Sequence, residues 1–217
     1  MKFRLVSLLI LLMLLLSSCS MPFIAADTLP WINDEPILFK DDFQIQQGGW
    51  STIEDPFSYV GYDQGGFRLR TNVPNFQVWS VPGLNFRNTQ VITRTQKIAG
   101  PEDNLFGILC RYQDESHFYA FIISSDGYYG IYERKGEHLA LIDQAHMDFS
   151  DVINSGSEVN DLQAYCYDDQ LAFFVNDTLL IQVQDDTLTY GDVGIMAGNF
   201  EQGGVDILFD YFIVAHR

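Results

Sequence analysis

Residues 106–134 read FGILCRYQDESHFYAFIISSDGYYGIYER, three apolar and aromatic runs interrupted by two short polar breaks. The breaks, DES at 114–116 and SDG at 125–127, have the length of hairpin connections, and Asp-Gly tolerates the left-handed backbone of tight turns. Isoleucine, phenylalanine and tyrosine dominate the runs, as is typical of half-buried strands. The stretch therefore predicts three consecutive antiparallel strands. Apolar residues occupy both alternating positions, so the pattern leaves open which side chains face the core.

The same succession of short runs and turns extends over residues 37–217. We expect about twelve strands, with further turns at KGEH (135–138), at Asp168 and Asp169, and at NDT (176–178), where Asn176 would adopt the left-handed conformation. Residues 146–156 are the best place for one short helical turn, capped by Ser150. The pattern predicts a single all-β domain, a two-sheet antiparallel β-sandwich over residues 37–217.

The first 36 residues differ in character. Lys2 and Arg4 precede an apolar run over residues 5–16, which is shorter than the ~20 residues of a membrane-spanning helix, and LSSC follows at 16–19. This order is typical of an export signal, and LSSC resembles the bacterial lipobox, whose cysteine is acylated and becomes the first residue. We therefore expect a signal peptide at 1–18, then lipidated Cys19 and a tether at 19–36. An ordinary secretory signal with an incidental cysteine is the alternative.

These features predict an extracytoplasmic protein of a bacterial cell, held at the cell membrane or outer membrane by its lipid. The chain has 12 Lys and Arg against 29 Asp and Glu, a formal net charge of −17. Such a surface repels nucleic acid, so no nucleic-acid partner is expected. Two cysteines remain after Cys19, Cys110 and Cys166, and in an oxidising compartment an even remainder suggests a disulfide. Two buried free thiols are the alternative.

Several segments in order carry a family resemblance. They are FKDDF (39–43), GGW (48–50), the stretch 107–134, NDLQAYCYDDQLAFFVNDTLL (160–180), GDVGIMAG (191–198) and VDILFDYFIV (205–214). Together they resemble the concanavalin A-like lectin/glucanase jelly rolls of bacterial surface proteins, near the family-16-type glucanase and 3-keto-disaccharide hydrolase group. The resemblance implies two stacked sheets, one of them concave, with glycans lying across the concave sheet. It also implies that the strands of Cys110 and Cys166 lie close enough to form a disulfide.

The sequence shows no arrangement typical of catalysis. Glycoside hydrolysis needs two carboxyl groups about 5 to 9 Å apart, and the ExDxxE-type strand of retaining family-16 glucanases is absent. A GxSxG nucleophile elbow is also absent, and the four histidines are scattered. We therefore expect no catalytic residues, and the acidic side chains are interpreted as a solvated surface.

Binding chemistry is the remaining interpretation. Aromatic rings with nearby polar groups suit the apolar faces and hydroxyls of sugars, although aromatic residues in strands more often pack in the core. Our first hypothesis is a non-catalytic, membrane-anchored, lectin-like module for carbohydrate. A divergent glycoside-acting hydrolase and an interaction domain without a small ligand are the alternatives. The candidate ligand-binding residues are Trp79, Arg94, Arg111, Tyr119, Tyr128 and Tyr132.

A structural calcium ion is the one cofactor that the resemblance suggests. Members of this superfamily often hold one where the first and last strands meet, which here implies Asp41 or Asp42 together with Asp210. Calcium takes several oxygen ligands, and backbone carbonyls can complete the set. The alternative is that Asp210 only accepts hydrogen bonds from a turn. No other cofactor is expected.

Overall fold

The structure is a computed structural model that describes residues 36–216. The expected signal peptide, Cys19 and all but the last residue of the tether lie outside the described residues. The described chain forms sixteen β-strands. Within it, no helix is long and apolar enough to cross a membrane. The predicted all-β fold is confirmed.

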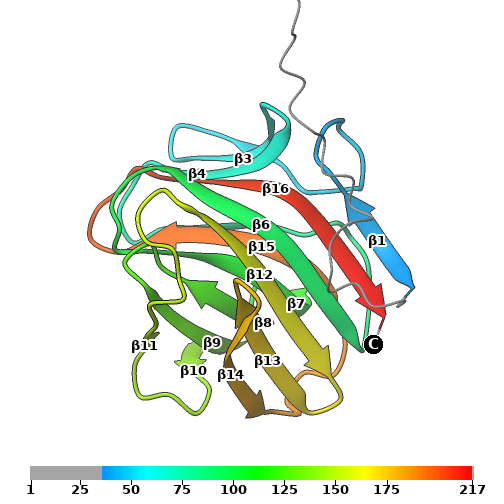
Figure 1. The fold of residues 1–217 in the computed structure, drawn as a ribbon. Coiled ribbons are helices and arrows are strands. Elements are labelled where there is room, and N and C mark those ends of the chain that lie inside the picture. The colour runs from blue at the N-terminus through cyan, green and yellow to red at the C-terminus, as the bar shows by residue number, and fades with distance from the viewer. Residues whose placement is uncertain (1–35, 217) are drawn as a thin grey trace, which may run out of the picture. The chain divides into compact units, whose positions relative to one another are not determined.

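The strands form two antiparallel sheets that stack as two layers, as Figure 1 shows. In the nine-stranded sheet the order is β14-β13-β12-β6-β16-β4-β3-β2, and β1 pairs with β16 beside the C-terminus. The members of this sheet are β1 (Ile37–Asp41), β2 (Ile53–Glu54), β3 (Ser58–Asp63), β4 (Gly66–Thr71), β6 (Thr89–Ala99), β12 (Val159–Tyr167), β13 (Gln170–Val175), β14 (Thr178–Gln184) and β16 (Val205–His216).

The second sheet has seven strands in the order β10-β9-β8-β7-β15-β5, with β11 paired to β9. Its centre is the consecutive meander β7-β8-β9, which is the stretch that predicted three antiparallel strands. The members are β5 (Gln77–Ser80), β7 (Asn104–Asp114), β8 (His117–Ile123), β9 (Tyr128–Lys135), β10 (His138–Leu141), β11 (Asp148–Phe149) and β15 (Asp192–Asn199).

The structure settles which alternating positions of β8 face the core. Tyr119 and Phe121 belong to the main cluster between the sheets, which also takes in Phe173 of β13 and Phe212 of β16. The other set, which includes Phe118, packs in a second apolar cluster on the outer face of the seven-stranded sheet. Both faces of this strand are covered, so neither shows the polar alternation of a solvated surface.

The two sheets are joined covalently by a Cys110–Cys166 disulfide, from β7 to β12. The predicted bond is therefore present, and both cysteines lie fully buried in the main cluster. Because Cys166 stands between Tyr165 and Tyr167, the bond fixes the strand from which these two rings project.

The turns of the β12-β13-β14 meander lie where the sequence predicts them. Asp168 (φ 47°) lies in the turn between Tyr167 and Gln170, while Asn176 (φ 47°) and Asp177 (φ 64°) connect β13 to β14 in the left-handed region. Two successive left-handed residues match the right-handed twist of a hairpin.

The expected helical turn in 146–156 is wrong. This segment contains β11 and a non-helical turn, in which the Ser150 hydroxyl accepts a hydrogen bond from the Val152 amide at 3.2 Å. Pairing of Asp148 and Phe149 with β9 holds these two residues in an extended conformation. Ser150 therefore caps a turn, as a serine before a helix would, but no helix follows it.

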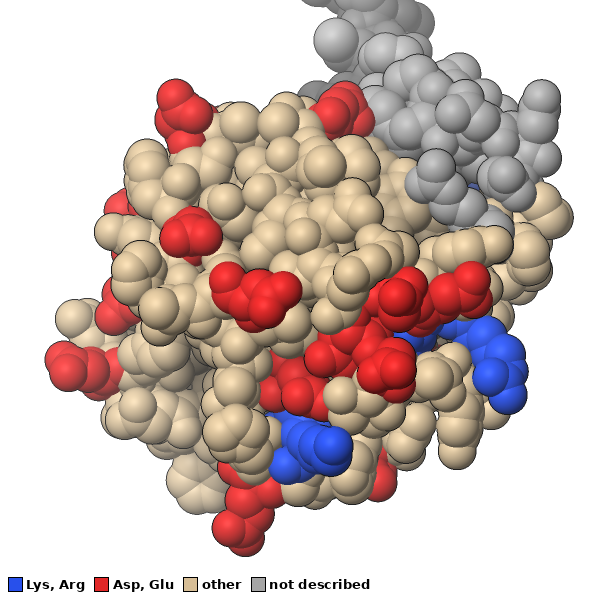
Figure 2. All heavy atoms as spheres, turned by 90° about the horizontal axis from the view of Figure 1, so that it is seen from below, with Lys and Arg blue, Asp and Glu red and all other residues tan. Residues whose placement is uncertain are grey.

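The charged side chains lie mainly on the surface. Figure 2 shows a face with many more Asp and Glu than Lys and Arg, and the rest of that face is largely uncharged. The most buried ionic contact joins Arg68 to Asp206, whose carboxylate accepts from the guanidinium Nε and Nη2 at 2.6 Å each.

Candidate functional site

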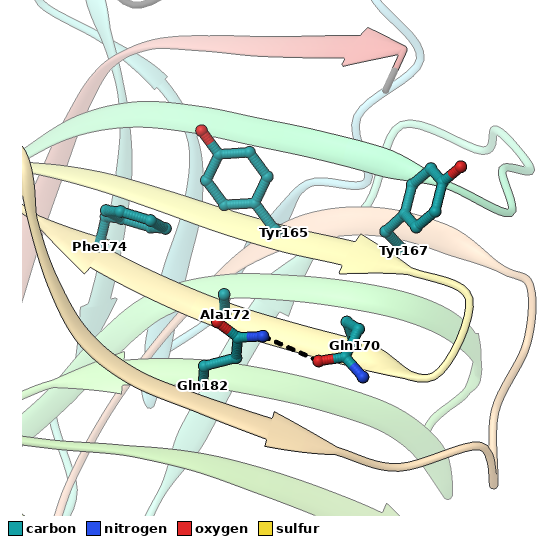
Figure 3. Close-up of a pocket in the computed structure, with 6 residues that line it drawn as sticks. All are labelled: Tyr165, Tyr167, Gln170, Ala172, Phe174 and Gln182. Carbon is teal, nitrogen blue, oxygen red and sulfur yellow. Dashed lines mark hydrogen bonds between the residues drawn. The ribbon is translucent and has the colours of Figure 1, made fainter.

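A pocket of about 460 Å³ lies on the outer face of the nine-stranded sheet, over β12, β13 and β14 (Figure 3). Its volume lies within the ~300–1,000 Å³ range of small-molecule sites. The lining combines three aromatic rings, two side-chain amides and one methyl group, with no carboxylate among them. The lining residues are Tyr165, Tyr167, Gln170, Ala172, Phe174 and Gln182.

The hollow follows from the size of one side chain. Ala172 pairs with Tyr165 on one side and with Gln182 on the other, so a short methyl group stands between two longer side chains on the same face. Alternate residues of the strand, Leu171 and Phe173, point into the main core. Because successive side chains of a strand point to opposite faces, the buried set fixes the outward direction of Ala172 and makes it the floor of the pocket.

Hydrogen bonds hold the walls of the pocket in place. The Gln90 amide donates to the Tyr165 hydroxyl at 2.7 Å, and the Tyr165 ring meets the edge of Phe174 with centroids 5.1 Å apart. Across the floor, the Gln182 amide donates to the Gln170 carbonyl oxygen at 2.8 Å, as Figure 3 shows. Tyr167 is 42% exposed at the end of β12, so its ring remains accessible to a ligand.

The outer face of the seven-stranded sheet offers a different surface. Its apolar cluster leaves a cleft of only about 60 Å³, lined by nine residues among which Gln77 is the one with a side-chain amide. Trp79 covers part of this face, and its Nε1 donates to the Tyr112 hydroxyl at 3.3 Å. The cleft is far smaller than a typical ligand site.

Similarity to solved structures defines the fold. The described chain resembles the carbohydrate-binding module CBM66 from Bacillus subtilis, with a TM-score of 0.61 and 12% identity over 76% of this chain and 94% of that one. A Bacillus subtilis protein of unknown function with a galectin-like fold gives a TM-score of 0.59 and 13% identity, over 84% and 97% of the two chains. The β-glucanase of Bacillus licheniformis gives 0.58 and 11%, over 85% and 100%.

The chain has the concanavalin A-like jelly-roll fold. The resemblance read from the sequence is thereby confirmed at the level of the fold. No protein-family description matches the sequence, and no curated protein matches it. At identities of 11–13% the shared architecture carries no residue of a site from one protein to another.

The six predicted ligand-binding residues lie in different parts of the fold. Trp79 and Tyr132 share the outer apolar cluster of the seven-stranded sheet, where burial raises the pKa of the Tyr132 hydroxyl. Tyr128 is exposed at the β8-β9 hairpin, with its ring 5.6 Å from that of Phe149. Tyr119 is buried between the sheets, and its hydroxyl donates to the Asp185 carboxylate.

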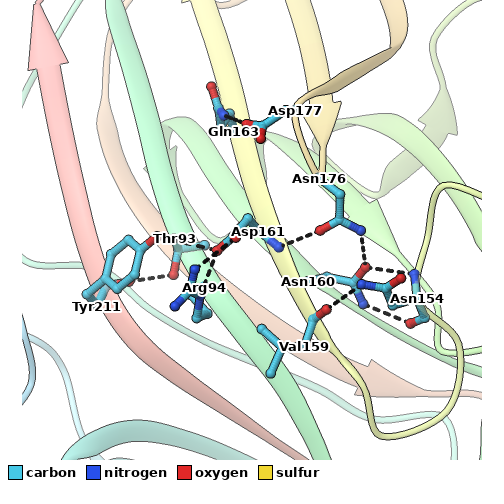
Figure 4. Close-up of polar contacts among 10 residues, drawn as sticks. All are labelled: Thr93, Arg94, Asn154, Val159, Asn160, Asp161, Gln163, Asn176, Asp177 and Tyr211. Carbon is cyan, nitrogen blue, oxygen red and sulfur yellow. Dashed lines mark hydrogen bonds and ion pairs between the residues drawn. The ribbon is translucent and has the colours of Figure 1, made fainter. Parts of the chain in front are cut away.

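The two predicted arginines have structural partners. Arg94 projects from β6 and forms an ion pair with Asp161 of β12, with Nε 2.8 Å from the carboxylate (Figure 4). Arg111 is buried, and its guanidinium donates to the carbonyl oxygens of Leu188 at 2.6 Å and Asp168 at 2.7 Å. Of the six residues, therefore, Trp79 and Tyr132 share one apolar cluster. Arg111 and Tyr119 meet at the Leu188 backbone, whose carbonyl oxygen accepts from Arg111 and whose amide donates to the Tyr119 hydroxyl at 3.0 Å.

A network of asparagine side-chain amides lies beside the Arg94–Asp161 pair (Figure 4). The Asn160 side chain exchanges hydrogen bonds with Asn154, and it accepts a third from the Asn176 amide at 2.9 Å. Asn176 also accepts from the Asp161 backbone amide at 3.0 Å. These bonds fasten the segment after β11 and the β13-β14 turn to β12, which stabilises the meander that carries the pocket.

Two of the residues expected around calcium, Asp41 and Asp42, serve other contacts, while Asp210 is exposed on β16. The buried Asp41 carboxylate accepts hydrogen bonds from the Phe43 amide at 2.8 Å, from Trp50 Nε1 at 3.1 Å and from the Tyr62 hydroxyl at 2.8 Å. Asp42 accepts from the Gln44 amide at 3.2 Å. Within residues 36–216 no group of three or more His, Cys, Asp or Glu side chains is placed to hold a metal ion. Backbone carbonyls also ligate calcium, so the site at Asp41, Asp42 and Asp210 stays a prediction.

None of the six pocket residues was among the predicted ligand-binding residues. A usable signal existed in β12 and β13, where Leu162, Ala164 and Cys166 alternate with polar and aromatic residues. The Asp168–Asp169 turn between these strands sets Tyr165 opposite Ala172. Alternation and turn together would have predicted a tyrosine facing an alanine on the solvent side.

Proposed function

We propose that the protein is a non-catalytic carbohydrate-binding module, held outside the cytoplasm by a lipid on Cys19, and that the pocket over Ala172 binds a sugar ring. One observation carries the proposal. Three aromatic side chains and two glutamine amides line a single pocket on the sheet surface. Aromatic rings pack against the apolar faces of a sugar, and the amides both donate to and accept from its hydroxyls.

The same pocket argues against bond cleavage at this place. Hydrolysis of a glycosidic bond normally needs two carboxyl groups beside the bond, whereas none lines the pocket. The jelly roll occurs both in a carbohydrate-binding module and in a β-glucanase, so the fold is compatible with either activity. The chemistry of the lining favours binding.

The proposed location is supported by two features of the chain. The basic start, the apolar run and LSSC precede the domain, as in exported lipoproteins. The domain itself contains the Cys110–Cys166 disulfide, and such bonds persist in oxidising compartments.

The decisive experiment measures binding of the full-length chain to an array of bacterial, plant and animal glycans, with a test for product release on every glycan that binds. We expect saturable binding without hydrolysis. Ala172→Trp fills the pocket and should abolish binding, and Tyr167→Ala should weaken it about thirty-fold, the loss typical of an aromatic hot-spot contact. Thr178→Trp is the control, because Thr178 is exposed on the same meander but does not line the pocket.

Three results would refute the proposal. Binding to no glycan would leave an interaction domain as the better reading. Release of a reducing end would make the protein an enzyme. Full binding by Ala172→Trp would place the ligand elsewhere on the molecule.

A further inference from the structure

A second pocket, of about 330 Å³, contains an arginine, Arg87, that has no ionic partner within residues 36–216. It is lined by Asn85, Phe86, Arg87 and Tyr190. The Arg87 guanidinium carbon lies 5.9 Å from the centroid of the Tyr190 ring, so the cation stands over the aromatic ring. Both side chains are exposed, Tyr190 by 45%.

Among the described arginines, Arg70 and Arg134 also form no ion pair, and Arg70 also stands over a tyrosine ring, that of Tyr59 at 5.6 Å, but neither residue lines this pocket. Three other arginines are engaged by protein groups. Arg68 and Arg94 are each neutralised by aspartates within 3 Å, and Arg111 is buried against carbonyl oxygens. Arg87 forms no ion pair within the described chain, although acidic side chains greatly outnumber basic ones. With the guanidinium carbon over the ring, the N–H donors at its edge remain available to a planar acceptor.

The backbone around the pocket is held from several sides. Phe86 and Gly191 exchange two backbone hydrogen bonds, of 2.8 and 2.9 Å, which fix the Arg87 segment against the Tyr190 segment. The buried Arg111 guanidinium donates to the carbonyl oxygens of Arg87, Asp168 and Leu188. A site held in this way needs little ordering when a ligand binds.

The same contacts connect the second pocket to the first. Asn88, next to Arg87, accepts from the Asp168 backbone amide at 3.0 Å and donates to the Asp168 carboxylate at 3.1 Å. Asp168 directly follows Tyr167, whose ring lines the first pocket. The segment before β6 and the segment after β12 are therefore joined at the two pockets, so one extended ligand could span both.

We propose that the Arg87–Tyr190 pocket is a second subsite that binds the carboxylate of an acidic sugar unit, so that the preferred ligand is a glycan bearing uronic acid. This inference rests on the proposed carbohydrate-binding function. The guanidinium edge donates two parallel N–H···O hydrogen bonds to the carboxylate, and the Asn85 amide is available to a hydroxyl of the same unit. The net charge of −17 disfavours densely charged polyanions, so the carboxylates must be sparse along an otherwise neutral chain.

The test compares pairs of oligosaccharides, each pair consisting of a uronic-acid-containing member and its carboxyl-reduced, neutral counterpart. Binding of the full-length chain is measured by calorimetry. We expect the acidic member to bind about ten-fold more tightly, the order of a partly exposed charge-assisted contact. Arg87→Gln should remove this preference, so that both members bind with similar affinity, and Tyr190→Phe, which keeps the ring, should retain the preference.

Lys135→Gln is the matched control, because it removes one exposed positive charge outside the pocket. It should leave the preference intact. Equal binding of both members by the unmodified chain would overturn the inference alone, since neutral binding would still support the proposed function. Equal effects of Arg87→Gln and Lys135→Gln would overturn it as well, by assigning the preference to net charge. A sulfated counterpart that binds as tightly would overturn the carboxylate assignment, and failure of every member to bind would overturn both proposals.

Discussion

Removal of the Cys110–Cys166 disulfide should destabilise the jelly roll strongly. The bond joins residues 56 positions apart and links one sheet to the other. In the chain-entropy description, a loop of this length restricts the unfolded chain by about 4 kcal/mol at 25 °C. For a domain of this size 1 kcal/mol corresponds to roughly 2–4 °C in Tm. The Cys110→Ala/Cys166→Ala variant should therefore unfold about 8–16 °C below the oxidised protein.

The assay is thermal unfolding followed by circular dichroism on three samples: the oxidised protein, the double variant, and the wild-type chain prepared in reduced form. The reduced chain keeps both sulfur atoms in the core, so its difference from the oxidised protein isolates the covalent link from the loss of packing. The variant should unfold at or below the temperature of the reduced chain.

A drop in Tm smaller than about 3 °C for both samples would contradict a stabilisation of about 4 kcal/mol by this bond. It would show that the unfolded ensemble is already restricted near these residues, or that the bond is absent in the folded protein. Binding to the array should weaken in parallel with unfolding, since Cys166 fixes the strand between the two pocket tyrosines.

Two further predictions concern buried carboxylates. Asp206→Asn should lower the free energy of unfolding in urea by about 2–3 kcal/mol, because it leaves Arg68 without its most buried partner. Asp63→Asn, at the more exposed partner, should lower it by less than about 1 kcal/mol. Equal losses would contradict this ranking. Burial raises the pKa of Asp192, so the folded state binds the proton of this carboxyl more tightly than the unfolded state does. The contribution of Asp192 to the free energy of unfolding should therefore decline as pH rises from about 4 through the raised pKa. Asp192→Asn should lack that decline when unfolding is measured between pH 3.5 and 7, and identical pH profiles would count against the shift.

Local patterns were sufficient for the strands and turns. Apolar runs, Asp-Gly and Asn-Asp pairs encode short-range preferences, and each of these turns formed where the sequence places it. They were insufficient for residues 146–156, because pairing of Asp148 and Phe149 with a strand about twenty residues earlier overrides the helical signal of Ser150.

The same distinction between local patterns and tertiary contacts applies to the candidate site. In β12 and β13, regular alternation and a two-residue turn contained enough information to place Tyr165 over Ala172. In β8 both faces are apolar, so no local rule distinguishes Tyr119 from Phe118. Tyr119 faces inward, where the Asp185 carboxylate, 66 residues away, accepts from its hydroxyl.

Periodicity, turn chemistry and composition act over a few neighbouring residues, so they were enough to predict an acidic, all-β chain with hairpins at fixed places and two cysteines to pair. The packing of the two sheets was needed to place Arg111 among carbonyl oxygens, to leave Arg87 exposed over Tyr190, and to open a pocket above Ala172. The roles of these side chains depend on which distant strands become neighbours, and that depends on how two sheets with apolar faces stack, which no single strand specifies.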